Sequence, residues 1–249
     1  MVESRPSLDD PERIDAIRRR IRGTPALELW YRECYAKFAA CIDRAAGDGP
    51  VLELGSGAGF LREILPEVIT SDVLPYEGVD RVIDATHLPY EDGALRAIVM
   101  LNVFHHIADA GAFLSEVDRC LAPGGRLFMV DQHVGWISGP ILAHAHHEPF
   151  DREARDWYFD SQGPLQSANG ALTWIVFCRD RVLLEARHPR LRLARYDPHT
   201  PLRYFLAGGL KRWSLLPGWA FPMASALDRA LLSLSAELGS FVDVELVRR

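Results

Sequence analysis

The sequence predicts a doubly wound α/β fold, in which helices cover a mostly parallel sheet. From residue 51 to residue 131 short apolar runs alternate with helical segments, the pattern typical of a parallel sheet with crossover helices. The first apolar run, Val51–Leu54, leads directly into a glycine-rich loop over Gly55–Gly59. Ligands of open α/β sheets bind at the carboxyl ends of the strands, so we expect a ligand site at that edge.

Apolar runs and helix signals place the elements of this sheet. Five strands are expected, at 51–54, 68–72, 81–84, 97–102 and 126–131. A short helix is predicted over Phe60–Leu65, directly after the glycine loop. A longer helix precedes the fifth strand, since Asp109 can cap its start and Pro123-Gly124-Gly125 can stop it.

The N-terminal part is predicted to be helical. Apolar residues recur at spacings of three and four over Glu12–Ala46, and Gly23-Thr24-Pro25 divides this stretch into two helices. We interpret residues 1–46 as N-terminal helices that form a lid or the substrate side. Residues 47–249 then form the main domain.

The C-terminal part combines an insertion with two more strands. Residues from about 133 to 185 show no clean period and are interpreted as a substrate-binding insertion over the sheet. Strands are expected at 191–196 and 241–247, separated by a helix over about Met223–Gly239. These two strands are predicted to close the sheet as an antiparallel pair.

Composition limits the classes of function. The 249 residues are 48% hydrophobic and 25% charged, as in an ordinary globular domain. The net charge of −6 argues against a nucleic-acid partner, and the short run Arg18-Arg19-Arg20 is interpreted as a solvated helix face. The sequence shows no signal peptide and no run of about 20 apolar residues that would span a bilayer. The four cysteines are scattered along the chain, and we interpret them as free thiols: Cys34, Cys41, Cys120 and Cys178. Free thiols fit a reducing compartment, so we expect a cytoplasmic protein.

The glycine loop departs from the dinucleotide-binding pattern. G-x-G-x-x-G requires a third glycine where this chain has Phe60. Glu53, at the end of the first strand, would repel a pyrophosphate but can attract an ammonium group or its bound water. Asp72 can accept hydrogen bonds from ribose hydroxyls, and Asp84 from an adenine amino group. Each carboxylate taken alone has an alternative role as a helix cap or loop residue, whereas three of them at successive strand ends favour a ligand site.

Five segments resemble the motifs of the class I S-adenosylmethionine-dependent methyltransferases, most closely the small-molecule, type 11 domain. They occur in the family's order over about residues 51–131: Val51–Gly59, Thr70–Val73, Asp84–Tyr90, Ala97–Ile107 and Leu121–Leu127. The resemblance implies a Rossmann-like, seven-stranded sheet in the order 3-2-1-4-5-7-6 with the last strand antiparallel. It also implies S-adenosylmethionine as cofactor. The residues that the resemblance assigns to cofactor binding are Glu53, Gly55, Ser56, Gly57, Gly59, Phe60, Asp72, Val73, Asp84, Ala85, Leu101 and Asn102.

His105 and His106, which follow the fourth strand, are the candidate catalytic residues. Methyl transfer from a sulfonium is an in-line displacement that needs a general base only for some acceptors, and histidine suits a hydroxyl acceptor. Under the alternative interpretation, His106 is a buried histidine that packs under the loop and bonds to backbone.

Two segments of the variable part have open interpretations. The cluster His144, His146, His147 and Glu148 lacks helical metal-ligand spacing, so no metal site is assigned, and a substrate-side base is its other possible role. The aromatic segment Trp213–Pro222 is broken by two prolines. It fits core packing, a pocket wall, a dimer surface or peripheral membrane contact.

The sequence as a whole predicts transfer of a methyl group to a small-molecule acceptor, with a hydroxyl of a sugar, glycolipid or secondary metabolite as the favoured acceptor. An NAD(P)-dependent oxidoreductase is the alternative enzyme, disfavoured by Glu53 and Phe60. A non-catalytic binding subunit on the same fold is the third possibility, since a fold does not by itself confer activity.

Overall fold

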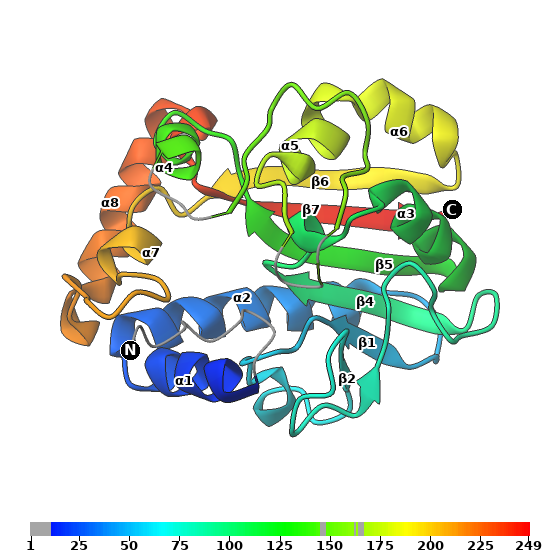
Figure 1. The fold of residues 1–249 in the computed structure, drawn as a ribbon, viewed down its shortest axis with the longest axis horizontal. Helices are drawn as coiled ribbons and strands as arrows, with labels where there is room; N and C mark the ends of the chain where they lie inside the picture. Colours follow the sequence, from blue (N-terminus) through cyan, green and yellow to red (C-terminus); the bar gives the residue numbers. More distant parts are fainter. Residues whose placement is uncertain (1–10, 145–147, 162, 164–166) are drawn as a thin grey trace, which may run out of the picture.

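The computed structural model, which describes residues 11–144, 148–161, 163 and 167–249, has a seven-stranded sheet at its centre (Figure 1). The strand order is β3-β2-β1-β4-β5-β7-β6, as the sequence predicts. The strands are β1 (Val51–Leu54), β2 (Ile69–Asp72), β3 (Arg81–Val82), β4 (Leu95–Leu101), β5 (Leu121–Gln132), β6 (Leu191–His199) and β7 (Phe241–Arg248).

Strand direction brings four strand ends to one edge. β1 pairs in parallel with β2 and β4, and β4 pairs in parallel with β5. β7 runs antiparallel to both β5 and β6, which confirms the predicted orientation of the last strand. The residues that follow β1, β2, β4 and β5 therefore meet at the carboxyl edge of the sheet.

Two hydrophobic layers cover the two faces of the sheet. Because side chains alternate along a strand, Val99 of β4 packs toward α1 (Pro11–Arg22) and α2 (Pro25–Arg44), whereas Ile98 and Met100 pack toward α3 (Ala110–Cys120). The second layer is completed by insertion elements, namely α5 (Leu172–Trp174), the π-helical turn η3 (Ile175–Arg179) and α6 (Arg181–Arg187). None of the helices in the described part of the chain combines the length and apolar character needed to cross a bilayer.

Further helices gather beyond the carboxyl ends of β4 and β5. Figure 1 shows α4 (Ser138–His144), α7 (Arg203–Leu206) and α8 (Phe221–Leu234) at this end of the molecule, with α1 below them. Of these elements, α1, α4 and α7 contribute residues to the cavity at this edge of the sheet.

Most helix boundaries agree with the sequence signals, but the helix expected over about Met223–Gly239 ends at Leu234, and a separate 3-10 turn, η5 (Ala236–Leu238), follows it. Pro25 begins α2, and the Asp109 carboxylate accepts a hydrogen bond from Ala112 N at 2.9 Å as the cap of α3. The helix expected over 60–65 is wrong, because only a 3-10 turn, η1 (Leu61–Glu63), forms there. Pro66 comes three residues after the end of this turn, and a proline disfavours helical backbone at the residue before it, here Leu65.

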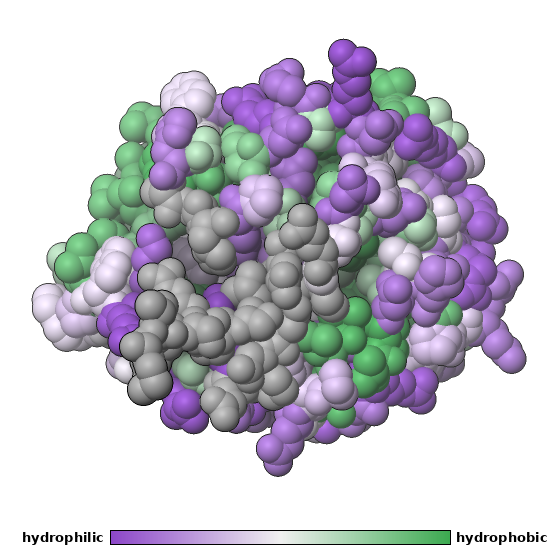
Figure 2. All heavy atoms as spheres, in the orientation of Figure 1, coloured by the Kyte–Doolittle hydropathy of each residue, from purple (hydrophilic) through white to green (hydrophobic). Residues whose placement is uncertain are grey.

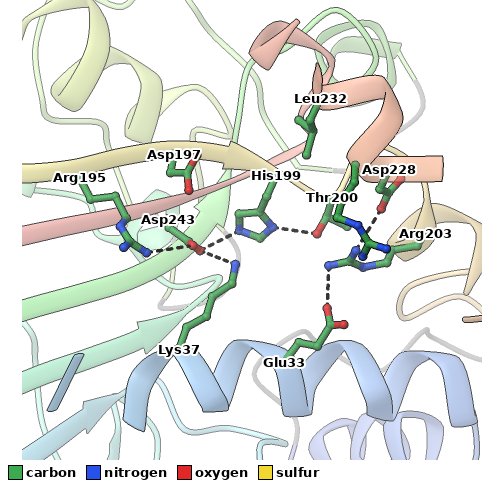
Figure 3. Close-up of a pocket in the computed structure, with 11 residues that line it drawn as sticks. Glu33, Lys37, Arg195, Asp197, His199, Thr200, Arg203, Asp228, Leu232 and Asp243 are labelled. Atoms are coloured by element: carbon green, nitrogen blue, oxygen red, sulfur yellow. Dashed lines mark hydrogen bonds and ion pairs between the residues drawn. The ribbon is translucent and has the colours of Figure 1, made fainter. Parts of the chain in front are cut away.

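A polar cluster ties α2 to the antiparallel strands (Figure 3). Asp243 of β7 is 2% exposed, and its carboxylate lies 2.9 Å from Lys37 Nζ and 2.8 Å from His199 Nε2. A second pair joins Arg203 to Glu33 at 2.6 Å. Because these side chains form ion pairs with one another between four elements, α2, β6, α7 and β7, we interpret the cluster as structural.

Candidate active site

The glycine loop after β1 needs glycine at two positions. Gly55 has a φ of 67° and Gly57 a φ of 41°, in the left-handed region that side chains rarely adopt. A Cβ on Gly55 would lie 2.3 Å from a methyl carbon of Val103. The loop can therefore approach the end of β4 closely only because this residue has no side chain.

Hydrogen bonds from two acidic residues hold the loop in place. Ser56 Oγ donates to the Glu53 carboxylate at 2.6 Å, and Gly57 N donates to Asp72 Oδ2 at 3.0 Å. The second oxygen of Asp72 accepts from Leu74 N at 3.3 Å. Asp72 thus shapes the loop itself, in addition to the role in ribose binding that its position predicts.

Glu53 is a buried carboxylate with a shifted pKa. Its side chain lines the cavity at the loop, yet the residue is only 3% exposed. Burial raises the pKa of Glu53 to about 7, although the hydrogen bond from Ser56 acts in the opposite direction. A cationic ligand group beside this carboxylate would favour its ionised form.

A cavity of about 1410 Å³ opens at the carboxyl edge of the sheet. Its walls come from the glycine loop, the end of β4, α1, α4 and the segment after α7. Eight of the predicted site residues line it: Glu53, Gly55, Ser56, Gly59, Leu101, Asn102, His105 and His106. One space therefore joins the predicted cofactor loop to the two candidate catalytic histidines.

The other predicted cofactor residues do not line this cavity. Phe60 packs against Tyr35 and lies under the guanidinium of Arg22. Asp84 is exposed and accepts hydrogen bonds from Thr86 N and Oγ1, both at 2.8 Å, so it caps its own turn. The residues that do not line the cavity are Gly57, Phe60, Asp72, Val73, Asp84 and Ala85.

Asn102 carries an unsatisfied acceptor on the cavity wall. Its backbone is left-handed, with a φ of 55°, and its N–H donates to Val130 O at 2.8 Å. The side-chain Oδ1 is buried and has no hydrogen-bond partner among the described residues. Since a buried acceptor without a donor costs free energy, this oxygen is suited to receive a hydrogen bond from a ligand.

His105 and His106 follow β4 on the 3-10 turn η2 (Phe104–His106), and both rings reach the cavity. Their ring centroids are 4.2 Å apart. His105 Nδ1 lies 2.5 Å from Asp131 Oδ1, and His106 Nδ1 lies 3.1 Å from the backbone oxygen of Ser167. The alternative interpretation of His106 correctly anticipates this backbone contact, but the ring also lines the cavity.

Glu148 joins the two histidines from the insertion. Its carboxylate lies 3.4 Å from His105 Nε2 and 3.6 Å from His106 Nε2. Two neighbouring members of the predicted cluster, His146 and His147, lie outside the described residues. The Glu148 carboxylate thus contacts two histidine rings that lie more than 40 positions earlier in the chain.

The two histidines have opposite protonation behaviour. Burial lowers the pKa of His105, but Asp131 and Glu148 outweigh it and raise the value to about 10. Burial and the neighbouring charge of His105 lower the pKa of His106 to about 4. At neutral pH His105 therefore carries a proton on both nitrogens, whereas His106 is uncharged and retains a lone pair.

Comparisons with known proteins agree with this architecture. Residues 52–129 match the family described as a methyltransferase domain. This part of the chain is similar to the S-adenosylmethionine-dependent methyltransferases. The cofactor of the family is S-adenosylmethionine, and the matched residues run from β1 to β5.

Individual relatives of this methyltransferase domain are distant. The chain is 31% identical over 100 residues to the ubiquinone/menaquinone biosynthesis C-methyltransferase UbiE of Desulfotalea psychrophila, an alignment that covers 36% of this chain and 40% of that one. It is 33% identical over 112 residues to the demethylmenaquinone methyltransferase of Thermus thermophilus, covering 36% and 51%. The chain thus spans about half or less of the length of these relatives.

A solved structure shows the same fold over nearly the whole chain. A chain of the complex between the Haloferax volcanii Trm112 methyltransferase activator and the putative methyltransferase has a TM-score of 0.52 and 17% identity. The match covers 96% of each chain. It extends the likeness in fold beyond residues 52–129.

Sequence reasoning missed several residues of this methyltransferase site. Asp131 is another carboxylate near a strand end, so the rule that selected Asp72 and Asp84 would also have found it. Arg19 and Arg20, predicted to lie on a solvated helix face, line the cavity. Arg20 also binds Ala207 O at 3.1 Å and Trp213 O at 2.5 Å, so it holds the segment after α7 against α1.

Proposed function

We propose that this protein transfers a methyl group from S-adenosylmethionine to a small-molecule acceptor in the 1410 Å³ cavity. The observation that carries the proposal is the continuity of one cavity from the glycine loop and Glu53 to the cluster of His105, His106 and Glu148. The loop end has the shape and charge for the methyl donor. The cluster end has groups that can act on an acceptor.

The donor end is proposed to bind S-adenosylmethionine through backbone and carboxylate contacts. Glu53 faces the methionine ammonium or a water bound to it, and Asn102 Oδ1 accepts a hydrogen bond from the ligand. Asp72 contributes to ribose binding and Asp84 to adenine binding, as their strand-end positions predict. A cofactor held in this way would have its methyl group available to an acceptor in the part of the cavity lined by His105 and His106.

The acceptor is proposed to be a hydroxyl of a sugar, glycolipid or secondary metabolite. In-line attack on the methyl requires alignment of the acceptor and loss of its proton. His106 is the histidine able to take that proton in the protein without a bound metal, because its ring is uncharged at neutral pH. One of the named relatives, UbiE, is a C-methyltransferase, and a carbon acceptor activated through a neighbouring hydroxyl would use the same group.

The surface beside the cavity favours an amphiphilic acceptor. Trp213, Leu215 and Trp219 are 47%, 72% and 78% exposed, and Trp213 also lines the cavity. Figure 2 shows hydrophobic residues gathered over α8 at this edge of the molecule. Lys211 and Arg212 lie in the same segment, so an apolar surface with flanking positive charge borders the cavity. This combination is typical of contact with an anionic lipid surface and supports a glycolipid acceptor.

Calorimetry with S-adenosylhomocysteine tests the donor assignment. We expect one bound equivalent, and roughly tenfold weaker binding in Asn102→Ala, since one buried hydrogen bond contributes about 1–1.5 kcal/mol. Glu185→Gln, on the exposed face of α6, is the control that should leave binding unchanged. Absence of binding, or stabilisation by NADPH instead, would overturn the proposal in favour of the oxidoreductase.

An acceptor panel tests the transfer itself. Labelled S-adenosylmethionine, incubated with sugars, glycolipid vesicles and phenolic metabolites, should yield a labelled product with the methyl on oxygen. Cofactor binding without transfer to any acceptor would favour a non-catalytic binding subunit. The cytoplasmic location and the absence of a nucleic-acid partner stay predictions.

A further inference from the structure

Three ligand-type side chains converge where the cavity meets η2. The side chains of His105, His106 and Glu148 each offer one metal-ligating atom, and these three atoms lie within 4.8 Å of one another. None of the three is a surface residue: His105 is 1% exposed, and the side chains of His106 and Glu148 are 18% and 15% exposed. The three side chains are therefore largely buried, and all of them line the cavity.

The spacing fits ligands of one ion. Two atoms that each lie about 2.1 Å from a metal, at a tetrahedral angle, are about 3.4 Å apart. The Glu148 carboxylate oxygens lie 3.4 Å from His105 Nε2 and 3.6 Å from His106 Nε2. No large movement of the side chains is needed to bring all three to coordination distance.

The other nitrogen of each ring is held as in metal centres. Ligating histidines usually donate their second N–H to a carboxylate or a backbone carbonyl, which orients the ring. His105 Nδ1 lies 2.5 Å from Asp131, and His106 Nδ1 lies 3.1 Å from the Ser167 carbonyl. Both Nε2 atoms are thereby directed to Glu148 and the cavity.

The donor set indicates the class of ion. Two imidazoles and one carboxylate suit zinc, iron, cobalt or manganese better than calcium or magnesium, which prefer all-oxygen sites. Three protein ligands leave coordination positions open, as catalytic metal sites require. Here those positions would face the space assigned to the acceptor.

We propose that His105, His106 and Glu148 form a binding site for a divalent first-row transition metal ion whose open positions receive an oxygen of the methyl acceptor. The role in acceptor binding rests on the proposed function, whereas metal binding does not. A coordinated hydroxyl is more acidic, so coordination replaces proton acceptance by His106 when the ion is bound. Binding of the ion displaces the proton from His105 Nε2, and this proton and the one from the coordinated hydroxyl leave to solvent.

Direct binding of Zn²⁺ and Co²⁺ to the chelator-treated full chain tests the site. We expect one equivalent by calorimetry, and a Co²⁺ visible spectrum typical of low-coordinate nitrogen and oxygen ligation. Glu148→Gln keeps the shape of the side chain but removes its charge, and should weaken Zn²⁺ at least tenfold. His106→Ala should weaken it further, and His87→Ala, at an exposed histidine, is the matched control with unchanged affinity.

The outcomes separate this proposal from the proposed function. Zn²⁺ that binds equally well to wild type, Glu148→Gln and His106→Ala would overturn the site, as would the absence of a saturable equivalent. Stoichiometric Zn²⁺ binding without binding of S-adenosylhomocysteine would overturn the proposed function and leave the site intact. S-adenosylhomocysteine binding without Zn²⁺ binding would overturn the metal site and leave the proposed function intact.

Discussion

Ionisation of Glu53 should make cofactor affinity depend on pH. Burial raises the pKa of this carboxyl to about 7 in the protein without ligand, compared with about 4.3 for an exposed glutamate. A protonated Glu53 cannot attract the methionine ammonium, so the site must lose a proton before it binds. Affinity should therefore rise as pH rises through 7 and level off above it.

The size of this effect follows from the fraction of ionised Glu53. With a pKa of about 7, roughly a tenth of the molecules carry the carboxylate at pH 6 and roughly nine tenths at pH 8. The Kd for S-adenosylhomocysteine should therefore fall about tenfold between these two values, equivalent to about 1.4 kcal/mol.

The assay is calorimetry at fixed ionic strength across this range, with Glu53→Gln alongside the wild type. The amide can still accept the hydrogen bond from Ser56 but does not titrate, so its Kd should change only as the ligand's own groups change. Glu185→Gln should retain the wild-type change of Kd with pH, since Glu185 is an exposed side chain of α6. A flat wild-type profile, or an equal slope in Glu53→Gln, would refute the assignment of Glu53 to the cofactor ammonium.

Two further predictions concern stability. Gly55→Ala should lower the free energy of unfolding by about 2–4 kcal/mol, because its Cβ would overlap Val103 at a positive φ. In thermal melts, the same substitution should cause a smaller loss of stability in a Val103→Ala background. Equal losses in the two backgrounds would contradict the overlap. Asp243→Asn should cost about 2–3 kcal/mol, since it leaves the partly exposed Lys37 without its buried partner. S-adenosylhomocysteine affinity should be unchanged in Asp243→Asn, and a change would show that the cluster of Figure 3 acts on the donor site.

Local signals were sufficient for the sheet and for the donor loop. Apolar runs marked β1, β2, β4 and β5, because a buried strand is a short apolar stretch between turn residues. The glycines at 55 and 57 marked a turn that needs positive φ. The helix expected over 60–65 does not form, and the prediction had not allowed for the effect of Pro66 on the backbone of the residue before it.

The cluster of His105, His106 and Glu148 depended on tertiary structure. Glu148 lies in a segment without periodicity, and its distance from His105 is set by how the insertion folds back over η2. Spacing within the segment His144–Glu148 led to no metal assignment, because two of the three converging ligands come from the end of β4.

The sequence by itself determined the resemblance to methyltransferases, the strand order and the position of the glycine loop, since these depend on short segments with recognisable motifs. Only the tertiary structure decided which groups share the cavity. Contacts between β5, η2 and the insertion join residues far apart in the chain, and no local preference specifies them. Asp131, His105 and Glu148 became one cluster because the parallel order of β4 and β5 brings their carboxyl ends together beneath the insertion.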